Sequence, residues 1–278
     1  MTFTTANHLD DALRAYHHPV DERAGEIARA AIRHLYAFVE DVGLTRDEWF
    51  RGIQFLTAVG QLSDERRQEL VLLSDVLGVS TLVEMIDQRG APGTTEPTVL
   101  GPFHVEGAPR REMGDSIVID DDPGPRIRFR GVVRDVAGAP VEGAELDVWQ
   151  AASNGLYDVQ DPDATPMNLR GRFVTGADGR YELVTVRPVP YPIPGDGPVG
   201  AMLRACGRTD VRPAHTHVRV SAKGYRQVTT LLIDAGSAHL DTDPVFAVRE
   251  SLVVDMSGDT VDHDFVIEPV TPPGNLDD

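Results

Sequence analysis

Residues 212–220 read Arg-Pro-Ala-His-Thr-His-Val-Arg-Val. The proline and the alternation of apolar and polar residues after it predict a β-strand, on which residues two positions apart share a face. His215 and His217 should therefore present both imidazoles on one side of a sheet, where they could bind a metal. The pattern also fits a polar strand edge with two solvated histidines, so the rest of the chain must decide between the two interpretations.

Short β-prone runs flank this strand in the sequence, separated by turns such as Ala137-Gly138 and Ala177-Asp178-Gly179. Many short strands at this spacing are typical of a sandwich or barrel and not of an α/β fold. We therefore predict a mainly β domain built as an antiparallel β-sandwich. The runs lie at residues 117–119, 127–133, 145–150, 181–186, 227–233 and 264–267.

Residues 21–89 differ from the rest, because they contain almost no proline or glycine punctuation and carry apolar residues at helical spacing. The run Thr45-Arg46-Asp47-Glu48 matches a capping box, which predicts the start of a second helix near Asp47. A third helix should end at Gly78. A linker rich in glycine and proline then leads into the β-prone part. We therefore expect a helical region over residues 1–90 and a β-sandwich domain over residues 91–278.

The composition limits the possible classes of function. A formal charge of -18, from 26 Lys and Arg against 44 Asp and Glu, argues against nucleic acid or an anionic membrane surface as a partner. No apolar run approaches the roughly 18 residues that span a bilayer, so no membrane insertion is expected. The start of the chain lacks the basic and apolar regions of an export signal. The single cysteine, Cys206, excludes an internal disulfide and fits a reducing compartment, so we expect a cytoplasmic protein.

Two tyrosines stand where strand-forming aromatics are unusual. Tyr157 follows Gly155 in a turn, and Tyr191 lies in residues 188–194, which read Pro-Val-Pro-Tyr-Pro-Ile-Pro. Proline restricts the backbone, so Tyr191 is presented on a stiff segment that suits a metal ligand. Each tyrosine alone also fits an aromatic packed at the rim of a loop.

The donor chemistry of these four residues selects a metal. A phenol with a pKa of about 10 binds only a metal that is acidic enough to displace its proton. Zinc prefers Cys, His or carboxylate ligands, and a ferrous non-haem site usually has two His and one carboxylate. Two phenols with two imidazoles therefore point to Fe(III).

A set of short motifs is spread over nearly the whole chain. They read Pro-Thr-Val-Leu-Gly-Pro-Phe at 97–103, Leu-Asp-Val-Trp-Gln-Ala at 146–151, Gly-Leu-Tyr-Asp at 155–158, Arg-Gly at 170–171, Tyr-Pro-Ile-Pro at 191–194 and Arg-Pro-Ala-His-Thr-His at 212–217. In order and spacing they resemble the intradiol ring-cleaving dioxygenases. A helical region before a β-sandwich is similar to the catechol and hydroxyquinol branch of that family. The resemblance implies a homodimer through the N-terminal helices, with a phospholipid bound between them.

The resemblance also implies a site. By it, Tyr157, Tyr191, His215 and His217 are the ligands of a non-haem Fe(III), with a solvent hydroxide as fifth ligand. Tyr191 is implied to leave the metal and accept a substrate proton, so that it acts as ligand and as general base. Arg212 is always cationic and lies close to the His pair in sequence, so it is placed to stabilise negative charge that develops on the substrate. The substrates are then a small aromatic diol or triol and O2.

The segment around Leu72 and Asp75 resembles the hydroxyquinol-cleaving branch. A buried Asp75 that accepts a hydrogen bond from a third ring hydroxyl would favour hydroxyquinol (benzene-1,2,4-triol), because catechol would leave the carboxylate unpaired. The expected product is 3-hydroxy-cis,cis-muconate or maleylacetate. By resemblance the substrate pocket is formed by Leu72, Asp75, Val99, Leu100, Gly101, Pro102, Phe103, Ile193, Pro194, Arg212 and Val245.

Two alternatives stay open. The first is catechol 1,2-dioxygenase activity giving cis,cis-muconate, although Leu231 stands where catechol-cleaving members commonly carry a glutamine near the iron. Leu100 also departs from the pattern, because a bulkier aromatic is expected there in a close hydroxyquinol match. The second alternative is a prealbumin-like β-sandwich binding module, which residues 131–148 and 178–186 also resemble and which needs no iron. Since tyrosinate bound to Fe(III) absorbs visible light, the colour of the iron-loaded protein separates an enzyme from such a module.

Overall fold

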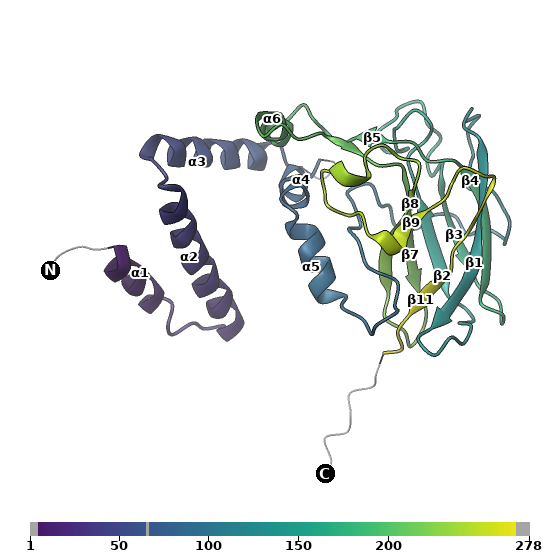
Figure 1. Ribbon diagram of the computed structural model, residues 1–278, viewed down its shortest axis with the longest axis horizontal. Coiled ribbons are helices and arrows are strands. Elements are labelled where there is room, and N and C mark those ends of the chain that lie inside the picture. Colours follow the sequence, from purple (N-terminus) through teal and green to yellow (C-terminus); the bar gives the residue numbers. More distant parts are fainter. Residues whose placement is uncertain (1–4, 65–66, 271–278) are drawn as a thin grey trace, which may run out of the picture. The chain divides into compact units, whose positions relative to one another are not determined.

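The chain folds into two compact units (Figure 1). The computed structural model describes residues 5–64 and 67–270, and the units are residues 1–58 and residues 59–278. The first unit is helical, and all the described strands belong to the second. Two helices that precede residue 90 belong to the second unit. None of the described helices is both long and apolar enough to cross a membrane.

The first unit consists of three helices, the last of which runs on into the second unit. Helix α2 begins after Asp21, whose carboxylate accepts hydrogen bonds from two backbone amides, and it ends at Gly43 in the left-handed conformation. The predicted capping box opens α3, where the Glu48 carboxylate accepts a hydrogen bond from the Thr45 amide at 2.9 Å and the Thr45 hydroxyl accepts one from the Glu48 amide at 3.3 Å. The predicted helix start is therefore confirmed. The helices are α1 (Thr5–Arg14), α2 (Glu22–Val42) and α3 (Arg46–Gln61).

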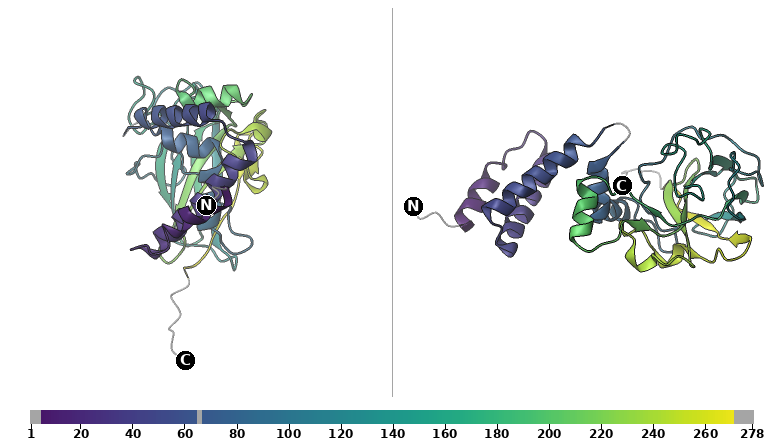
Figure 2. Two further views of the ribbon diagram at one scale, coloured as in Figure 1. Left: turned by 90° about the vertical axis from the view of Figure 1, so that its left-hand side faces the viewer. Right: turned by 90° about the horizontal axis from the view of Figure 1, so that it is seen from above.

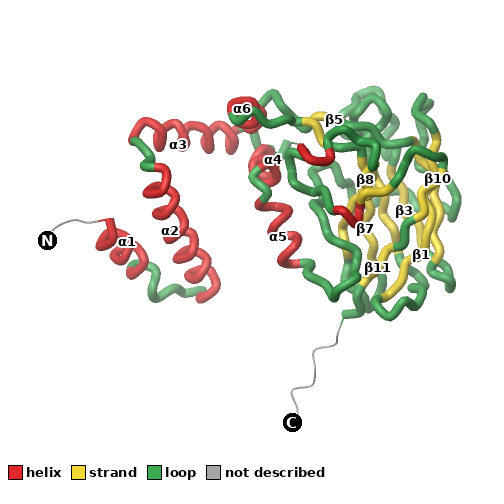
Figure 3. The backbone as a smooth tube through the Cα atoms, in the orientation of Figure 1, coloured by secondary structure: helices red, strands yellow, loops and turns green. Residues whose placement is uncertain are grey.

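Three further helices belong to the second unit, where α4 and α5 lie beside the strands (Figure 3). Gly78 separates α4 from α5 with a φ of 75°, so the predicted helix stop at this glycine is confirmed. The amide of Val199, in the first turn of α6, donates a hydrogen bond of 3.2 Å to the buried carboxylate of Glu69. This bond joins α6 to the first turn of α4. The helices are α4 (Glu69–Val76), α5 (Val79–Asp87) and α6 (Pro198–Ala205).

Two larger sheets form the body of the second unit (Figure 2). They share one apolar core, to which the five-stranded sheet contributes Leu146 and Val220 and the four-stranded sheet contributes Phe129 and Phe265. The four-stranded sheet contains β1 (Arg126–Asp135), β4 (Arg180–Val186), β10 (Thr260–Asp262) and β11 (Phe265–Ile267). The five-stranded sheet has the order β3 (Arg170–Val174), β2 (Glu145–Trp149), β7 (His215–Ser221), β8 (Val228–Asp234), β9 (Val253–Val254). A small third sheet pairs β5 (Tyr191–Pro192) with β6 (Val211–Arg212).

The prediction of a mainly β domain is confirmed, but the prediction of purely antiparallel sheets is wrong. Strand β1 pairs in parallel with β10 and β11, and β8 pairs in parallel with β9. The chain reaches β9 from β8 through a crossover that contains the short helices η1 (Leu240–Thr242) and η2 (Glu250–Leu252), and a crossover returns the chain in the same direction. The sheets are therefore mixed.

Strands β10 and β11 pair one after the other with the same edge of β1, and the pairing is broken between them. Both strands pair with β1 in the same register. Between them the Tyr181 hydroxyl donates to the carbonyl oxygen of His263 at 2.7 Å, and the Asp264 carboxylate accepts from the amide of Val132 at 2.8 Å. The His263 carbonyl oxygen lies so close to Gly131 that a Cβ at this position would be only 1.8 Å from it. Residue 131 must therefore be glycine for the edge to close.

Candidate functional site

The four predicted metal ligands lie together in the second unit. The Tyr157 and Tyr191 Oη atoms are 3.1 Å apart, and Tyr191 Oη is 3.2 Å from Nε2 of His215. Nε2 of His215 is 3.2 Å from Nε2 of His217, so the two imidazoles do share one side of β7. Each of the four side chains is buried. Two phenol oxygens and two imidazole nitrogens therefore converge on one point.

Local structure positions each tyrosine. Tyr191 lies directly opposite Arg212 in the β5–β6 pair, and Arg212 comes shortly before the His-bearing strand β7. Tyr157 lies in the loop after β2, where its ring stacks on Phe103 with a centroid distance of 4.7 Å. The next residue, Asp158, forms a buried ion pair with Arg170 and accepts a hydrogen bond of 2.8 Å from its Nε. The ion pair fixes the loop beside the phenol.

The histidines are held neutral, with a ligand lone pair available. Nδ1 of His215 donates to the carbonyl oxygen of Pro213 at 2.7 Å, which leaves Nε2 as the unprotonated nitrogen. Burial, assisted by the charge of Arg212, lowers the pKa of His215 to about 3. Burial and the neighbouring His215 lower the pKa of His217 well below its ordinary value. Neutral imidazoles are the form that binds metal.

The donor set fits Fe(III). Within residues 5–64 and 67–270, no group of three or more His, Cys, Asp or Glu side chains could hold a metal. A metal at the His pair must therefore take the tyrosines as its other protein ligands. Burial and the nearby Tyr191 raise the pKa of Tyr157 well above its ordinary value, so only a strongly acidic metal ion would displace the phenol proton.

A pocket opens beside the four ligands. Tyr191 and His217 form part of its wall, whereas Tyr157 and His215 do not. All the predicted substrate-binding residues line it except Leu100, which is 38% exposed. The pocket is lined by Leu72, Asp75, Val99, Gly101, Pro102, Phe103, Tyr191, Ile193, Pro194, Arg212, His217 and Val245.

Gly101, next to Leu100, forms a sharp turn in the pocket wall. The glycine has a φ of 75°, in the left-handed region that bulky residues avoid, so the chain turns sharply there. A Cβ on residue 101 would lie 3.4 Å from Cε1 of His217. The turn brings bare backbone against the His217 ring, while Val99 is buried in the wall.

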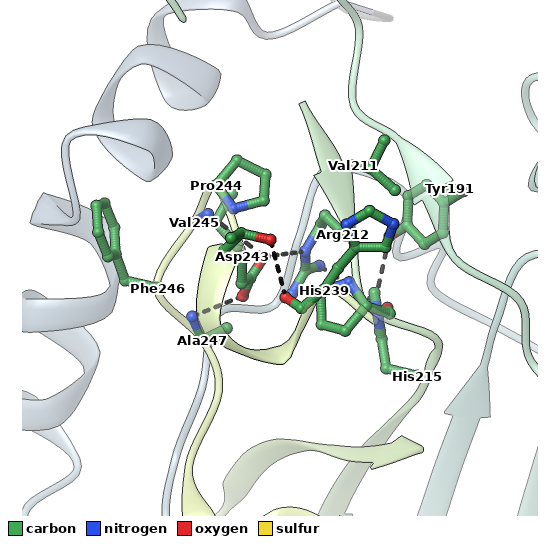
Figure 4. Close-up of polar contacts among 12 residues, drawn as sticks. Tyr191, Val211, Arg212, His215, His239, Asp243, Pro244, Val245, Phe246 and Ala247 are labelled. Atoms are coloured by element: carbon green, nitrogen blue, oxygen red, sulfur yellow. Dashed lines mark hydrogen bonds and ion pairs between the residues drawn. The ribbon is translucent and has the colours of Figure 1, made fainter. Parts of the chain in front are cut away.

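Arg212 offers an unused donor to this pocket. Its side chain is buried, Nε donates to Oδ1 of Asp243 at 3.2 Å, and Nη1 donates to Nε2 of His215 at 3.1 Å (Figure 4). Nη2 is buried and has no hydrogen-bond partner among the described residues. Burial lowers the pKa of Arg212, but the Asp243 carboxylate and the two tyrosines outweigh this effect, so the net shift is upward. A buried cation with one free N–H edge suits an anionic ligand.

Asp75, on α4, lines the same pocket. Its side chain is buried, and burial raises the pKa of its carboxyl, while a hydrogen bond with Ser80 and the charge of Arg212 lower it. Leu72, one turn earlier on the same helix, is also buried. The pocket therefore has one carboxyl group in an otherwise mainly apolar wall.

Two residues beside the site were not predicted from the sequence. Trp149, at the end of β2, lies opposite His217 in the β2–β7 register and stacks on its ring. Asp243 holds Arg212. The signal for Trp149 was a large aromatic at the end of a strand close to the first tyrosine motif. The signal for Asp243 was its position before Pro244, since Asp-Pro favours a turn.

Leu231 lies next to the site. It is fully buried on β8 and pairs directly with His217 across the β7–β8 ladder. Its side chain has no polar group, and Nδ1 of His217 has no hydrogen-bond partner among the described residues. The two imidazoles are therefore held differently, His215 by a hydrogen bond and His217 by ring stacking.

A larger cavity of about 380 Å³ lies elsewhere, and six of its fourteen lining residues are aspartates. Four of these carboxylates accept hydrogen bonds from other groups of the protein. Asp122 accepts hydrogen bonds from Ser153 and Gly124, and Asp158 pairs with Arg170. We therefore assign the chemistry to the pocket beside the tyrosines and histidines.

Comparisons with known proteins identify the family to which the chain belongs. Two family models match the chain, "Dioxygenase" over residues 99–268 and "Catechol dioxygenase N terminus" over residues 21–95. Hydroxyquinol 1,2-dioxygenase of a Rhizobium species is 45% identical over 265 residues, which cover 89% of this chain and 90% of that protein. 6-Chlorohydroxyquinol 1,2-dioxygenase of Cupriavidus pinatubonensis is 44% identical over 252 residues, with coverage of 89% and 91%.

Solved structures give the same result. Hydroxyquinol 1,2-dioxygenase from Pseudomonas putida matches with a TM-score of 0.91 and 43% identity, covering 96% of this chain and 99% of that chain. Catechol 1,2-dioxygenase from Pseudomonas arvilla matches with a TM-score of 0.81 and 28% identity, covering 96% and 93%. The chain therefore belongs to the intradiol ring-cleavage dioxygenase family, in the branch that contains the hydroxyquinol and catechol 1,2-dioxygenases.

Proposed function

We propose that this chain cleaves the ring of hydroxyquinol between its two adjacent hydroxyl-bearing carbons, with O2 as co-substrate, to give 3-hydroxy-cis,cis-muconate or maleylacetate. The observation that carries the proposal is the buried carboxyl of Asp75 in the wall of the same pocket as Tyr191 and Arg212. A catechol has no hydroxyl to offer that group, whereas hydroxyquinol has one. Relatives that are 43% to 45% identical and bear the name hydroxyquinol 1,2-dioxygenase support the same substrate.

The cofactor in this proposal is Fe(III). Tyr157, Tyr191, His215 and His217 would hold it, because their donor atoms converge and suit a hard, acidic metal. When bound, Fe(III) supplies Lewis acidity that draws electron density from the diol ring and makes the ring reactive toward O2.

Tyr191 acts as the base for a substrate hydroxyl. The two adjacent hydroxyls of the substrate must lose their protons on binding. With Fe(III) bound, Tyr191 would be a phenolate whose Oη accepts one proton, and a solvent hydroxide would take the other. Supporting this role, Tyr191 lines the pocket and Tyr157 does not. Tyr157 stays behind the pocket wall, stacked on Phe103.

Arg212 binds the negative charge that develops on the substrate during cleavage. Its free Nη2 is the donor for this purpose, in a buried position where a charge-assisted hydrogen bond is strong. Asp75 orients the ring by accepting a hydrogen bond from the third hydroxyl, and Val245 and Ile193 exclude water from the ring faces.

Substrate choice is tested by comparing purified, iron-loaded enzyme on hydroxyquinol and catechol side by side. Oxygen uptake and the ultraviolet absorption of the muconate product both report turnover. We expect kcat/KM for hydroxyquinol to exceed that for catechol by at least about tenfold. A preference for catechol would contradict the role of Asp75 and make the chain a catechol 1,2-dioxygenase.

The ligand assignment is tested by colour. Iron-loaded protein should absorb visible light through its tyrosinates, Tyr191→Phe should shift the band and impair turnover, and Tyr157→Phe should do the same. Tyr225→Phe, which changes a tyrosine bridged to Pro269 and outside the pocket, is the matched control. Colourless iron-loaded protein would instead favour the prealbumin-like binding module.

The quaternary structure and cellular setting also belong to the proposal. We propose that the helical region over residues 1–90 provides the dimer contact and that residues 91–278 form the catalytic domain, to whose pocket α4 adds Leu72 and Asp75, in a cytoplasmic homodimer with a phospholipid between the helices. Supporting this, α2 and α3 expose large apolar side chains, among them Leu35 at 61%, Phe38 at 52% and Trp49 at 53%. Light scattering should give a dimer for the wild type and a monomer for Phe38→Glu, and mass spectrometry of an organic extract should detect the lipid.

A further inference from the structure

We propose that Asp243 is a positioning residue for the reaction: its carboxylate holds the Arg212 guanidinium so that Nη2 stays free to face the substrate. The inference deepens the proposed function, because it rests on the role assigned there to Arg212. Asp243 lies just after η1 in the crossover between β8 and β9, outside every motif that identified the site.

The carboxylate of Asp243 is fully engaged with N–H donors (Figure 4). Oδ1 accepts from Nε of Arg212 at 3.2 Å and from the amide of Val245 at 3.4 Å, and Oδ2 accepts from the amide of Ala247 at 2.8 Å. The side chain is 2% exposed, so water does not compete for these bonds. An Asn at this position would have to turn its NH2 toward one of the donors, since every partner needs an acceptor.

The turn over residues 243–247 is itself anchored. Thr81 on α5 donates to the carbonyl oxygen of Val245 at 2.8 Å, and Arg208 donates to that of Pro244 at 3.0 Å. The guanidinium of Arg208 also lies over the ring of Phe246, with its Cζ 4.4 Å from the centroid. Phe246 has a φ of 57°, which a bulky residue adopts only where its surroundings hold it. The carboxylate of Asp243 is therefore presented by a rigid support.

A metal bound at the site would compete with Arg212 for the lone pair of His215 Nε2. Nη1 of Arg212 donates to the lone pair of His215 Nε2, and the same lone pair is the one that a metal ligand uses. When the metal uses that lone pair, Asp243 is the remaining polar partner of the Arg212 guanidinium among the described residues. The ion pair engages only Nε, so Nη2 stays available.

The charge of Asp243 has a second consequence for the pocket. A buried guanidinium without a counter-ion is costly, so Arg212 alone would draw a carboxylate or solvent anion into the pocket. With Asp243 in place, the Arg212 charge is balanced before substrate binds. The Arg212 guanidinium can therefore face the pocket without lowering the stability of the substrate-free protein.

A double-mutant cycle with chemical rescue tests the inference. The variants are Asp243→Asn, Arg212→Ala and both together, and each is measured for kcat/KM on hydroxyquinol, for anaerobic substrate Kd, for iron content and for the visible band. We expect Asp243→Asn to lower kcat/KM by about tenfold to a hundredfold with the band unchanged. In the Arg212→Ala background the same change should cost less than about threefold, because Asp243 then has no guanidinium to position.

Added guanidinium ion supplies a readout that a merely structural role would not change. Low concentrations should restore part of the activity of Arg212→Ala, where the Asp243 carboxylate remains to hold the ion, and none of the activity of the double variant. The double variant leaves no unpaired buried charge, so it folds even if Asp243→Asn does not. Asp243→Glu keeps the charge and should retain more activity than Asp243→Asn.

Asp122→Asn is the matched control, because Asp122 is also a buried aspartate that accepts backbone and hydroxyl hydrogen bonds, from Gly124 and Ser153, away from Arg212. Its kcat/KM should stay within about twofold of wild type once corrected for folded protein. Equal losses from Asp243→Asn with and without Arg212, or equal rescue of both Arg212→Ala backgrounds, would overturn the inference. Failure of wild type to bind or turn over either substrate would overturn the proposed function and this inference with it.

Discussion

The indole of Trp149 lies flat against the imidazole of His217, with ring centroids 4.8 Å apart and an interplanar angle of 9°. Trp149 is fully buried, and the edge of His104 contacts its ring at a centroid distance of 4.6 Å. Because Nδ1 of His217 has no hydrogen-bond partner among the described residues, the plane of this ring is set by packing.

Trp149→Ala should therefore damage both stability and the metal site. Truncation of a buried Trp costs about 3–5 kcal/mol of unfolding free energy, and loss of the stack frees the His217 ring. Trp149→Phe keeps an aromatic face and should cost less than half as much. Urea unfolding and iron content after dialysis against a chelator provide the measurements. Wild-type iron retention in Trp149→Ala would show that the stack does not orient His217.

Asp75→Val should change substrate preference more than overall activity. Valine is apolar and removes the acceptor for a third ring hydroxyl, so kcat/KM for hydroxyquinol should fall by about tenfold to a hundredfold while that for catechol holds or rises. Asp75→Asn keeps a weaker acceptor and should be intermediate. Glu84→Gln, on the neighbouring helix α5 and outside the pocket lining, is the control. An unchanged hydroxyquinol-to-catechol ratio in Asp75→Val would remove Asp75 from the substrate site.

The metal-free protein should lose stability as the pH falls below about 6.5. Burial lowers the pKa of His215 to about 3 and that of His217 well below its ordinary value, whereas both titrate near 6.5 when unfolded. Between these values the unfolded state binds more protons, so the free energy of unfolding falls with pH by up to about 1.4 kcal/mol per unit for each histidine. Above pH 6.5 this contribution is fully present.

Urea titrations of metal-free protein between about pH 8 and pH 5 measure this slope. The double variant His215→Gln/His217→Gln should have a shallower slope than wild type, and His34→Gln, an exposed histidine on α2, should match wild type. Parallel curves for wild type and the double variant would mean that the buried pair is not the source.

Gly131→Ala should destabilise the β domain strongly. The added Cβ would stand 1.8 Å from the His263 carbonyl oxygen, so the β10–β11 edge must move away from β1, at a cost of about 3 kcal/mol. Gly52→Ala is the comparison, because in the middle of α3 nothing beyond the chain neighbours and the backbone of the helix itself lies within 4 Å of the added Cβ, and helix propensity improves by about 0.5–1 kcal/mol. Two unfolding curves of similar midpoint would contradict the steric argument.

Local patterns predicted those parts of the fold that local interactions determine. The start of α3 follows from the Thr45 and Glu48 cap, the stop at Gly78 from its left-handed backbone, and the shared face of His215 and His217 from strand alternation. The convergence of these histidines with Tyr157 and Tyr191 was predicted from motif order together with donor chemistry. These features depend on residues that are close in sequence or on a family pattern.

The remaining features depend on contacts between distant residues. Strand direction is not encoded in alternation, so strands of two or three residues such as β9 and β11 could not be assigned as parallel. Helix α6 begins in a proline- and glycine-rich stretch that indicates a loop, and its first turn is bound by Glu69 from α4. Asp243 and Arg212 are 31 residues apart and meet only because the crossover after β8 folds back over β6.

The five residues from Asp243 to Ala247 limit how this pocket can be redesigned for other rings. Val245 contributes a side chain to the pocket wall, its amide binds Asp243, and its carbonyl oxygen is held by Thr81. A substitution at Val245 that widens the pocket would therefore also disturb the support of the Arg212 guanidinium. Ile193 lines the same pocket from the β5 side, where no bond to Asp243 is formed. Variation in ring size is easier to accommodate at position 193 than at position 245.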